Sequence, residues 1–109
     1  MRPSHISPAF YDHLLPWQEL TQLLDHFETA ERDQALLHIL EAVDLEIMNE
    51  ILTRLSSPSQ IEFLSLCLTR HHHPSLLEWL EQKFTGISQH IQAKAAATHS
   101  QLKIILVTI

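Results

Sequence analysis

Nine histidines in a chain of 109 residues make metal binding the first chemistry to consider. Helical metal sites place ligands three or four positions apart, as in His-Glu-x-x-His, and no two histidines here have that spacing. His71, His72 and His73 are consecutive, so their side chains diverge unless the backbone leaves the helix before Pro74. We interpret them as a weak candidate metal site, set against a solvated cluster that complements the helix dipole.

Cys67 lies four positions before His71, and this is the one pairing of a thiol with an imidazole at helical spacing. Such a pair could form a nucleophile or half of a metal site. Cys67 also falls between Leu64 and Leu68 on an apolar stripe. The sequence therefore favours a small core residue over a reactive cysteine.

Carboxylates are plentiful, for example Glu28, Glu31 and Asp33, but a cluster at a helix junction is typical of a solvated face. The sequence contains no glycine-rich dinucleotide fingerprint, no phosphate-binding loop and no G-x-S-x-G motif. We therefore expect no catalytic activity and no cofactor.

The formal net charge of −6 is unevenly distributed. Residues 12–50 hold ten acids and one base, whereas residues 82–109 hold three lysines and no acid. An acidic body argues against nucleic acid as the main partner and favours a basic protein surface. The single cysteine, the lack of a recognisable signal peptide and the lack of a long apolar run predict a cytoplasmic protein with no transmembrane segment.

The elements that must position these residues are predicted to be helices, because one glycine in the chain leaves little material for hairpins. The clearest is 44–56, which Asp44 caps and in which Leu52 is central in a wide apolar arc. The segments before and after it show the same helical periodicity or carry residues that typically start a helix. The further expected helices are 8–14, 16–28, 31–43, 57–71, 75–85 and 87–109. Residues 1–6 are expected to form a flexible arm.

The predicted fold is one all-α domain, a compact bundle of five to six helices with a long C-terminal helix. The alternative is a two-unit solenoid built from helical hairpins 31–56 and 57–86. Ser57, Pro58 and Gln60 predict a capping box, and Gly86 predicts a helix stop. The helix 57–71 is expected to bury Ile61, Phe63, Leu64, Cys67 and Leu68.

The C-terminal helix, 87–109, has apolar residues at alternating spacings of four and three, which indicates a seam for another helix. Trp79 lies away from the apolar stripe of its own helix and is a candidate anchor. The predicted partner-binding residues are Trp79, Lys83, Ile87, Ile91, Ala95, Leu102, Ile105 and Ile109.

These features predict a small helical protein–protein interaction module, an adaptor, regulator or secretion-type chaperone, that binds a protein partner or self-associates through its C-terminal helix. One alternative is a metal- or pH-responsive regulator that uses His71 to His73. Another is a subunit of a larger enzyme or complex.

Overall fold

The computed structural model describes residues 8–71 and 73–108, and every regular element in this part of the chain is a helix. The prediction of an all-α bundle is confirmed. The α-helices are α1 (Trp17–Gln22), α2 (Arg32–Arg54), α3 (Ser57–Arg70), α4 (Ser75–Lys83) and α5 (Ile87–Thr108), and short 3₁₀ turns occur at η1 (Asp12–Leu14), η2 (Leu23–His26) and η3 (Thr29–Glu31). The predicted arm over 1–6 lies outside the described residues.

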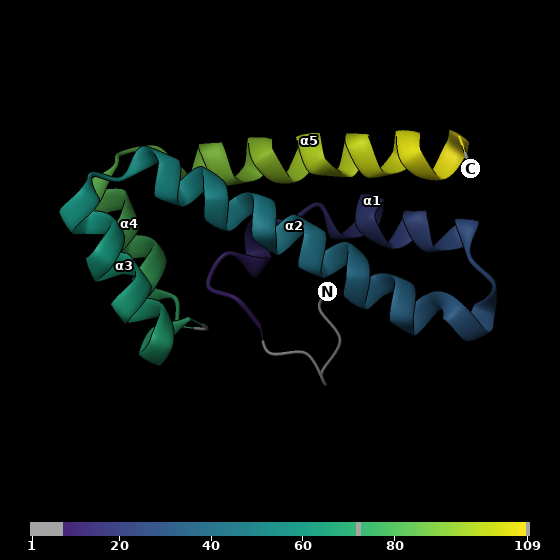
Figure 1. Ribbon diagram of the computed structural model, residues 1–109, viewed down its shortest axis with the longest axis horizontal. Coiled ribbons are helices and arrows are strands. Elements are labelled where there is room, and N and C mark those ends of the chain that lie inside the picture. The colour runs from purple at the N-terminus through teal and green to yellow at the C-terminus, as the bar shows by residue number, and fades with distance from the viewer. Residues whose placement is uncertain (1–7, 72, 109) are drawn as a thin grey trace.

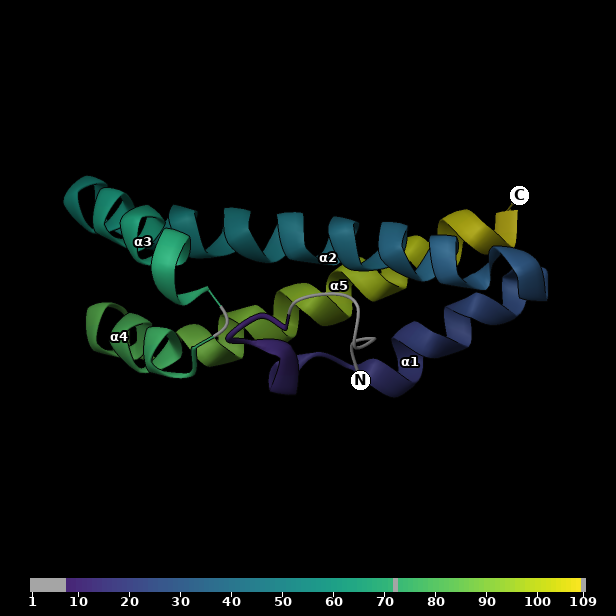
Figure 2. The ribbon, with the colours of Figure 1, turned by 90° about the horizontal axis from the view of Figure 1, so that it is seen from below.

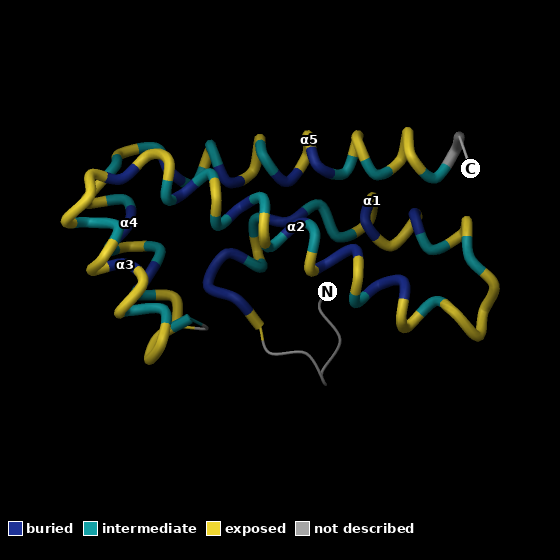
Figure 3. The backbone as a smooth tube through the Cα atoms, in the orientation of Figure 1, coloured by how far each residue is buried: buried dark blue, intermediate teal, exposed yellow. Residues whose placement is uncertain are grey.

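The long helices α2 and α5 run antiparallel and make the most extensive contact between any two elements (Figure 1). Apolar side chains spaced by four residues meet along this contact because such residues lie on one face of a helix. In Figure 3 buried segments alternate with exposed ones over the first half of α5, and its last turns are intermediate or exposed. The fully buried residues of the seam are Val43, Ile47 and Ile51 on α2 and Ile87, Ile91 and Ala95 on α5.

Two polar contacts flank the seam and join the same two helices. Lys94 Nζ lies 3.4 Å from Glu46 Oε2, and His90 Nδ1 lies 3.8 Å from Glu50 Oε1, a contact that is an ion pair only when the histidine is protonated. These groups are partly exposed, so each pair stabilises the fold by about 1 kcal/mol or less. The apolar seam therefore supplies most of the stabilisation between α2 and α5, and the charges help to set their register.

The prediction of separate helices over 31–43 and 44–56 is wrong, because α2 continues through Asp44 for 23 residues. The chain has no glycine or proline between positions 32 and 54 to end the helix. Asp44 accepts a hydrogen bond from a tyrosine hydroxyl instead of capping a helix. Because 31–56 is not a hairpin, the solenoid alternative is wrong as well.

That tyrosine is Tyr11, which is fully buried and whose hydroxyl donates to Asp44 Oδ1 at 2.6 Å. Hydrogen bonds to charged groups contribute roughly 1.5–3 kcal/mol. We expect Tyr11→Phe to lower the free energy of unfolding by about 1.5 kcal/mol, near the low end because Asp44 is partly exposed to water. Urea unfolding measures this loss, and Asp44→Asn is the reciprocal variant. An unchanged midpoint in Tyr11→Phe would show that the hydroxyl contributes nothing.

The N-terminal elements differ from the expected helices over 8–14 and 16–28. The first is reduced to the single turn η1, and the second is divided into α1 and η2. Leu20 and Leu23 are buried in the core, and the indole nitrogen of Trp17 donates to the carbonyl oxygen of Asp12 at 2.7 Å. This segment lies behind α2 and α5 in Figure 1 and covers one side of their contact (Figure 2).

Helices α3 and α4 form a pair at the opposite end of the molecule from α1 (Figure 2). Phe63 on α3 and Leu76 and Leu80 on α4 are buried in the core. The predicted capping box at the start of α3 does not form. The Gln60 side chain turns back and donates to the carbonyl oxygens of Leu52 and Leu55, so it caps the end of α2 instead.

The predicted break at Gly86 is confirmed, although α4 already ends at Lys83 and not at the predicted residue 85. Gly86 has a φ of 91°, a conformation that L side chains rarely adopt. Glu81 on α4 supports the same turn. Its carboxylate accepts hydrogen bonds from the backbone nitrogens of Gly86 at 2.8 Å and Ser88 at 2.9 Å. A side chain of α4 therefore caps the N-terminus of α5 and ties the two helices together.

These bonds lower the pKa of Glu81 below its ordinary value of 4.5, the bond from Ser88 most strongly. A lowered folded-state pKa means that the carboxylate's stabilisation is present above the unfolded-state pKa and is lost as pH falls through the folded-state pKa. We expect Glu81→Gln to cost at most about 1 kcal/mol at pH 7 and to flatten the stability profile below about pH 5. Thermal unfolding between pH 7 and 3 tests this, with Glu78→Gln, an exposed neighbour on α4, as the control. Parallel acid profiles for wild type and Glu81→Gln would contradict it.

Candidate partner-binding surfaces

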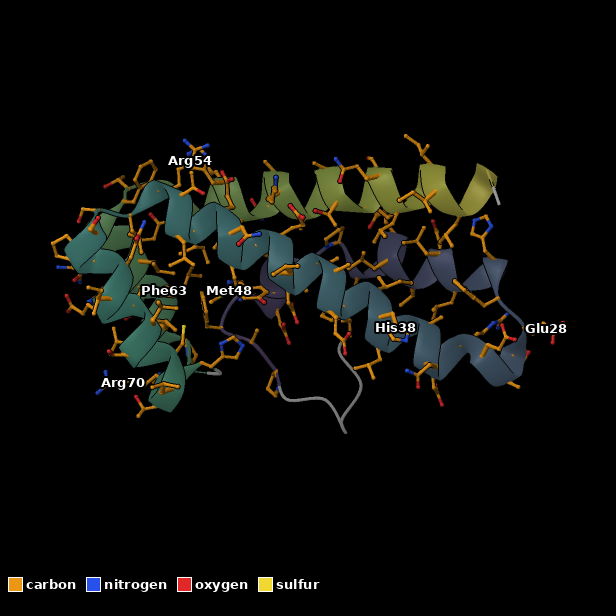
Figure 4. All side chains as sticks on the ribbon, viewed as in Figure 1. Glu28, His38, Met48, Arg54, Phe63 and Arg70 are labelled. Atoms are coloured by element: carbon orange, nitrogen blue, oxygen red, sulfur yellow. The ribbon has the colours of Figure 1, made fainter. Side chains whose placement is uncertain are left out.

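An apolar groove of about 210 Å³ lies where the last turns of α5 approach the first turns of α2. Its walls come from both helices, at spacings of three and four residues that place each set on one helix face. Phe27, which follows η2, contributes from a third element. The lining residues are Phe27, Ala35, His38, Ile39, Leu102, Ile105 and Leu106. Figure 4 labels His38 on this part of α2.

The predicted partner-binding residues of the C-terminal helix divide into two groups. Ile87, Ile91 and Ala95 have no exposed surface, because the seam that they form packs against α2 of the same chain. A partner could reach them only by displacing α2. By contrast, Leu102 is half-buried and Ile105 is 53% exposed, and both line the groove. Ile109 lies outside the described residues.

Trp79 and Lys83 both make contacts within the fold. The Trp79 ring stacks on Phe63 with the ring centroids 6.4 Å apart and the planes at 14°. Lys83 Nζ lies 5.5 Å from the centroid of the Trp79 ring. Trp79 is half-buried in this arrangement, so packing against α3 accounts for its position without a partner.

A second apolar surface runs along the outer face of α3, formed by Ile61, Leu64 and Leu68. These side chains are 70%, 47% and 88% exposed, so the prediction that they are buried is wrong. Apolar residues occur on all sides of α3, because Phe63, Leu66 and Cys67 lie on the opposite face. Periodicity alone could not choose which face α4 and the core would cover.

The candidate metal ligands make other contacts. The His71 ring packs edge-on against Phe10, with centroids 5.9 Å apart, and His73 Nδ1 accepts a hydrogen bond from the backbone nitrogen of Ser75. Within residues 8–71 and 73–108, no three His, Cys, Asp or Glu side chains converge to hold a metal ion. His72 lies outside the described residues.

Cys67 is half-buried against the core, although Leu64 and Leu68, with which the sequence grouped it, lie on the exposed face of α3. Burial raises the pKa of its thiol to about 11, which keeps the sulfur protonated near neutral pH and makes it a poor nucleophile. In the described part of the chain no hydrogen bond joins it to His71. The arrangement therefore gives no support to thiol chemistry at this position.

Sequence reasoning missed five of the seven groove residues, namely Phe27, Ala35, His38, Ile39 and Leu106. Ala35 and Ile39 also face the core and are 7% and 5% exposed. The groove arises because α2 and α5 separate beyond the seam, which depends on the helix crossing and is not encoded in the periodicity of either helix. The exposed apolar residues near the end of α5 were the one available indication.

None of the described helices is both long enough and apolar enough to cross a lipid bilayer. Comparison of the chain with protein-family models, with curated proteins and with solved structures finds no match.

Proposed function

We propose that this protein is a small, non-catalytic helical module that binds another protein, and that the groove between α2 and α5 is its binding site. The observation that carries this proposal is the groove itself, an open apolar site walled by Ile39, Leu102 and Ile105. Pockets lined by apolar side chains are where the anchor residues of protein interfaces usually bind. The adaptor, regulator and chaperone roles predicted from the sequence all require such a site.

The size of the groove favours a protein partner over a small-molecule ligand. Ligand sites usually enclose about 300–1,000 Å³, more than the 210 Å³ found here. A cavity of about 150 Å³ is large enough to hold benzene, so the groove has room for an aromatic or large aliphatic anchor. Binding through a buried anchor side chain is the usual way in which a protein interface concentrates its affinity.

The metal- or pH-responsive alternative has less support, because the described residues bring no three potential metal ligands together and His71 and His73 both make contacts within the fold. Self-association through α5 stays a prediction. It now concerns only the exposed residues at the end of that helix, because the earlier apolar residues are buried in the seam. The proposed site also keeps the two sequence-predicted residues, Leu102 and Ile105, that line the groove.

Adjacent isoleucines on α5 provide a matched test of the site. Ile105 lines the groove and is 53% exposed, whereas Ile104 is 65% exposed and does not line it. Helical peptides selected from an unbiased display library against the full chain should lose binding in Ile105→Asp and keep it in Ile104→Asp. Circular dichroism of both variants checks that the fold is intact. If the selected peptides bind both variants equally well, the groove is not the binding site and the proposal fails.

A further inference from the structure

Four carboxylates lie close in sequence to the residues that line the groove on the α2 side, and we call them the acidic rim. Asp25 and Glu28 flank Phe27 in sequence, Glu31 lies one helical turn before Ala35, and Glu41 lies one turn after His38. All four acids are exposed, and Figure 4 shows Glu28 at the end of the molecule where α2 begins. Residues 25–41 contain five carboxylates and one arginine, so the rim is strongly negative even next to the positive end of the α2 dipole.

Few of these charges are neutralised within the fold. Glu41 Oε2 lies 3.7 Å from His38 Nδ1, a contact that is an ion pair only when the histidine is protonated. In the described residues, Asp25, Glu28 and Glu31 make no ion pair. A partner with positive charges beside its apolar anchor would therefore meet unpaired carboxylates at the rim.

Resting on the proposed function, we infer that the groove binds a basic amphipathic helix of a partner protein. The groove is lined at i, i+3 and i+4 positions on α2 and at i, i+3 and i+4 positions on α5, so it presents two helix faces to its occupant. A third helix packs against two such faces by the same ridge-and-groove contacts that join helices within a bundle. Lysine or arginine on the flanks of that helix would lie against the acidic rim.

A second copy of this chain is a poorer match for the groove. The exposed apolar face of its α3 belongs to a segment with one acid and one arginine, Glu62 and Arg70. On the end of its α5, where Ile104 and Ile105 are exposed, Lys103 is the one lysine available, because Lys94 is already paired with Glu46. A neutral helix face satisfies the apolar part of the groove but leaves the rim carboxylates without partners.

The test uses two synthetic helical peptides with the same apolar face, one with lysine and one with glutamate at every flanking position. Binding to the full chain is measured by fluorescence anisotropy at low and high salt. The basic peptide should bind at least about tenfold more tightly than the acidic one, and the difference should shrink as salt screens the charges. Equal binding of the two peptides would overturn the inference while leaving the proposed function intact.

A matched pair of double variants separates the rim from the overall charge. Glu28→Gln with Glu31→Gln removes two rim carboxylates, and Glu62→Gln with Glu78→Gln removes two exposed carboxylates on α3 and α4. The rim variant should weaken the basic peptide about three- to tenfold, and the control should change it less than about twofold. Equal weakening in both would assign the preference to net charge and overturn the acidic rim.

Two further outcomes are decisive. If neither peptide binds and no library peptide depends on Ile105, the proposed function fails together with the inference. If sedimentation shows that the chain alone forms a dimer that Ile105→Asp abolishes and Ile104→Asp does not, a second copy occupies the groove and the basic partner helix is ruled out.

Discussion

Ending the chain after Gly86, and so removing α5, should unfold the protein. Without α5, the residues Val43, Ile47 and Ile51, which have no exposed surface in the fold, would lose their cover. Exposing side chains of this size costs about 1.5–3 kcal/mol each, or roughly 5–9 kcal/mol for the set. That loss is comparable with the whole stability of a small domain, about 5–15 kcal/mol. Far-ultraviolet circular dichroism should show loss of helix throughout the remaining chain.

A shorter truncation provides the control. Ending the chain after Ser100 keeps the seam from Ile87 to Thr98 and removes the α5 wall of the groove. This variant should remain folded but should lose affinity for helical peptides. The sequence alone also allows the C-terminal helix to be a docking arm, and in that case truncation after Gly86 would leave the helicity per residue unchanged. Retention of cooperative unfolding in the variant that ends at Gly86 would contradict the core role of α5.

The second large effect is expected for Ile47→Ala. Ile47 is fully buried in the seam between α2 and α5, and Ile→Ala changes in cores cost about 2–5 kcal/mol. Leu52, which the sequence placed at the centre of the apolar arc, is only half-buried, so Leu52→Ala should cost clearly less. Urea unfolding of the two variants gives both values. Leu45→Ala, at a position 62% exposed, should change stability by no more than about 0.5 kcal/mol.

The relative cost of Ile47→Ala and Leu52→Ala distinguishes the packing seen in the structure from the packing that the helical pattern alone predicts. If Leu52→Ala proves more damaging than Ile47→Ala, then α2 is rotated about its axis relative to the arrangement described above. The seam with α5 would then be formed by a different set of side chains.

Helix type was predictable because local features determine it. Pro58 and Gly86 mark a start and a stop that the structure keeps, and the spacing of Ile87, Ile91 and Ala95 correctly indicated a seam for another helix. The partner of that seam was not predictable. Whether a helix face packs on its own chain or on another protein depends on long-range geometry that periodicity does not contain.

The predicted helix boundary at Asp44 was wrong for a different reason. An aspartate before an apolar run is a common helix start, yet here its carboxylate bonds to Tyr11, which is 33 residues away in sequence. A long-range hydrogen bond of this kind leaves no local trace. The outer face of α3 was missed because apolar residues on all sides of a helix give no preferred direction for packing.

The most direct test of the proposed binding site is amide chemical-shift mapping on the ¹⁵N-labelled full chain during titration with the basic helical peptide. The largest shifts should fall on Phe27, residues 35–39 and residues 102–106, the segments that line the groove. Shifts confined to residues 61–68 on the outer face of α3 would place binding at the other exposed apolar surface and would contradict the proposed site.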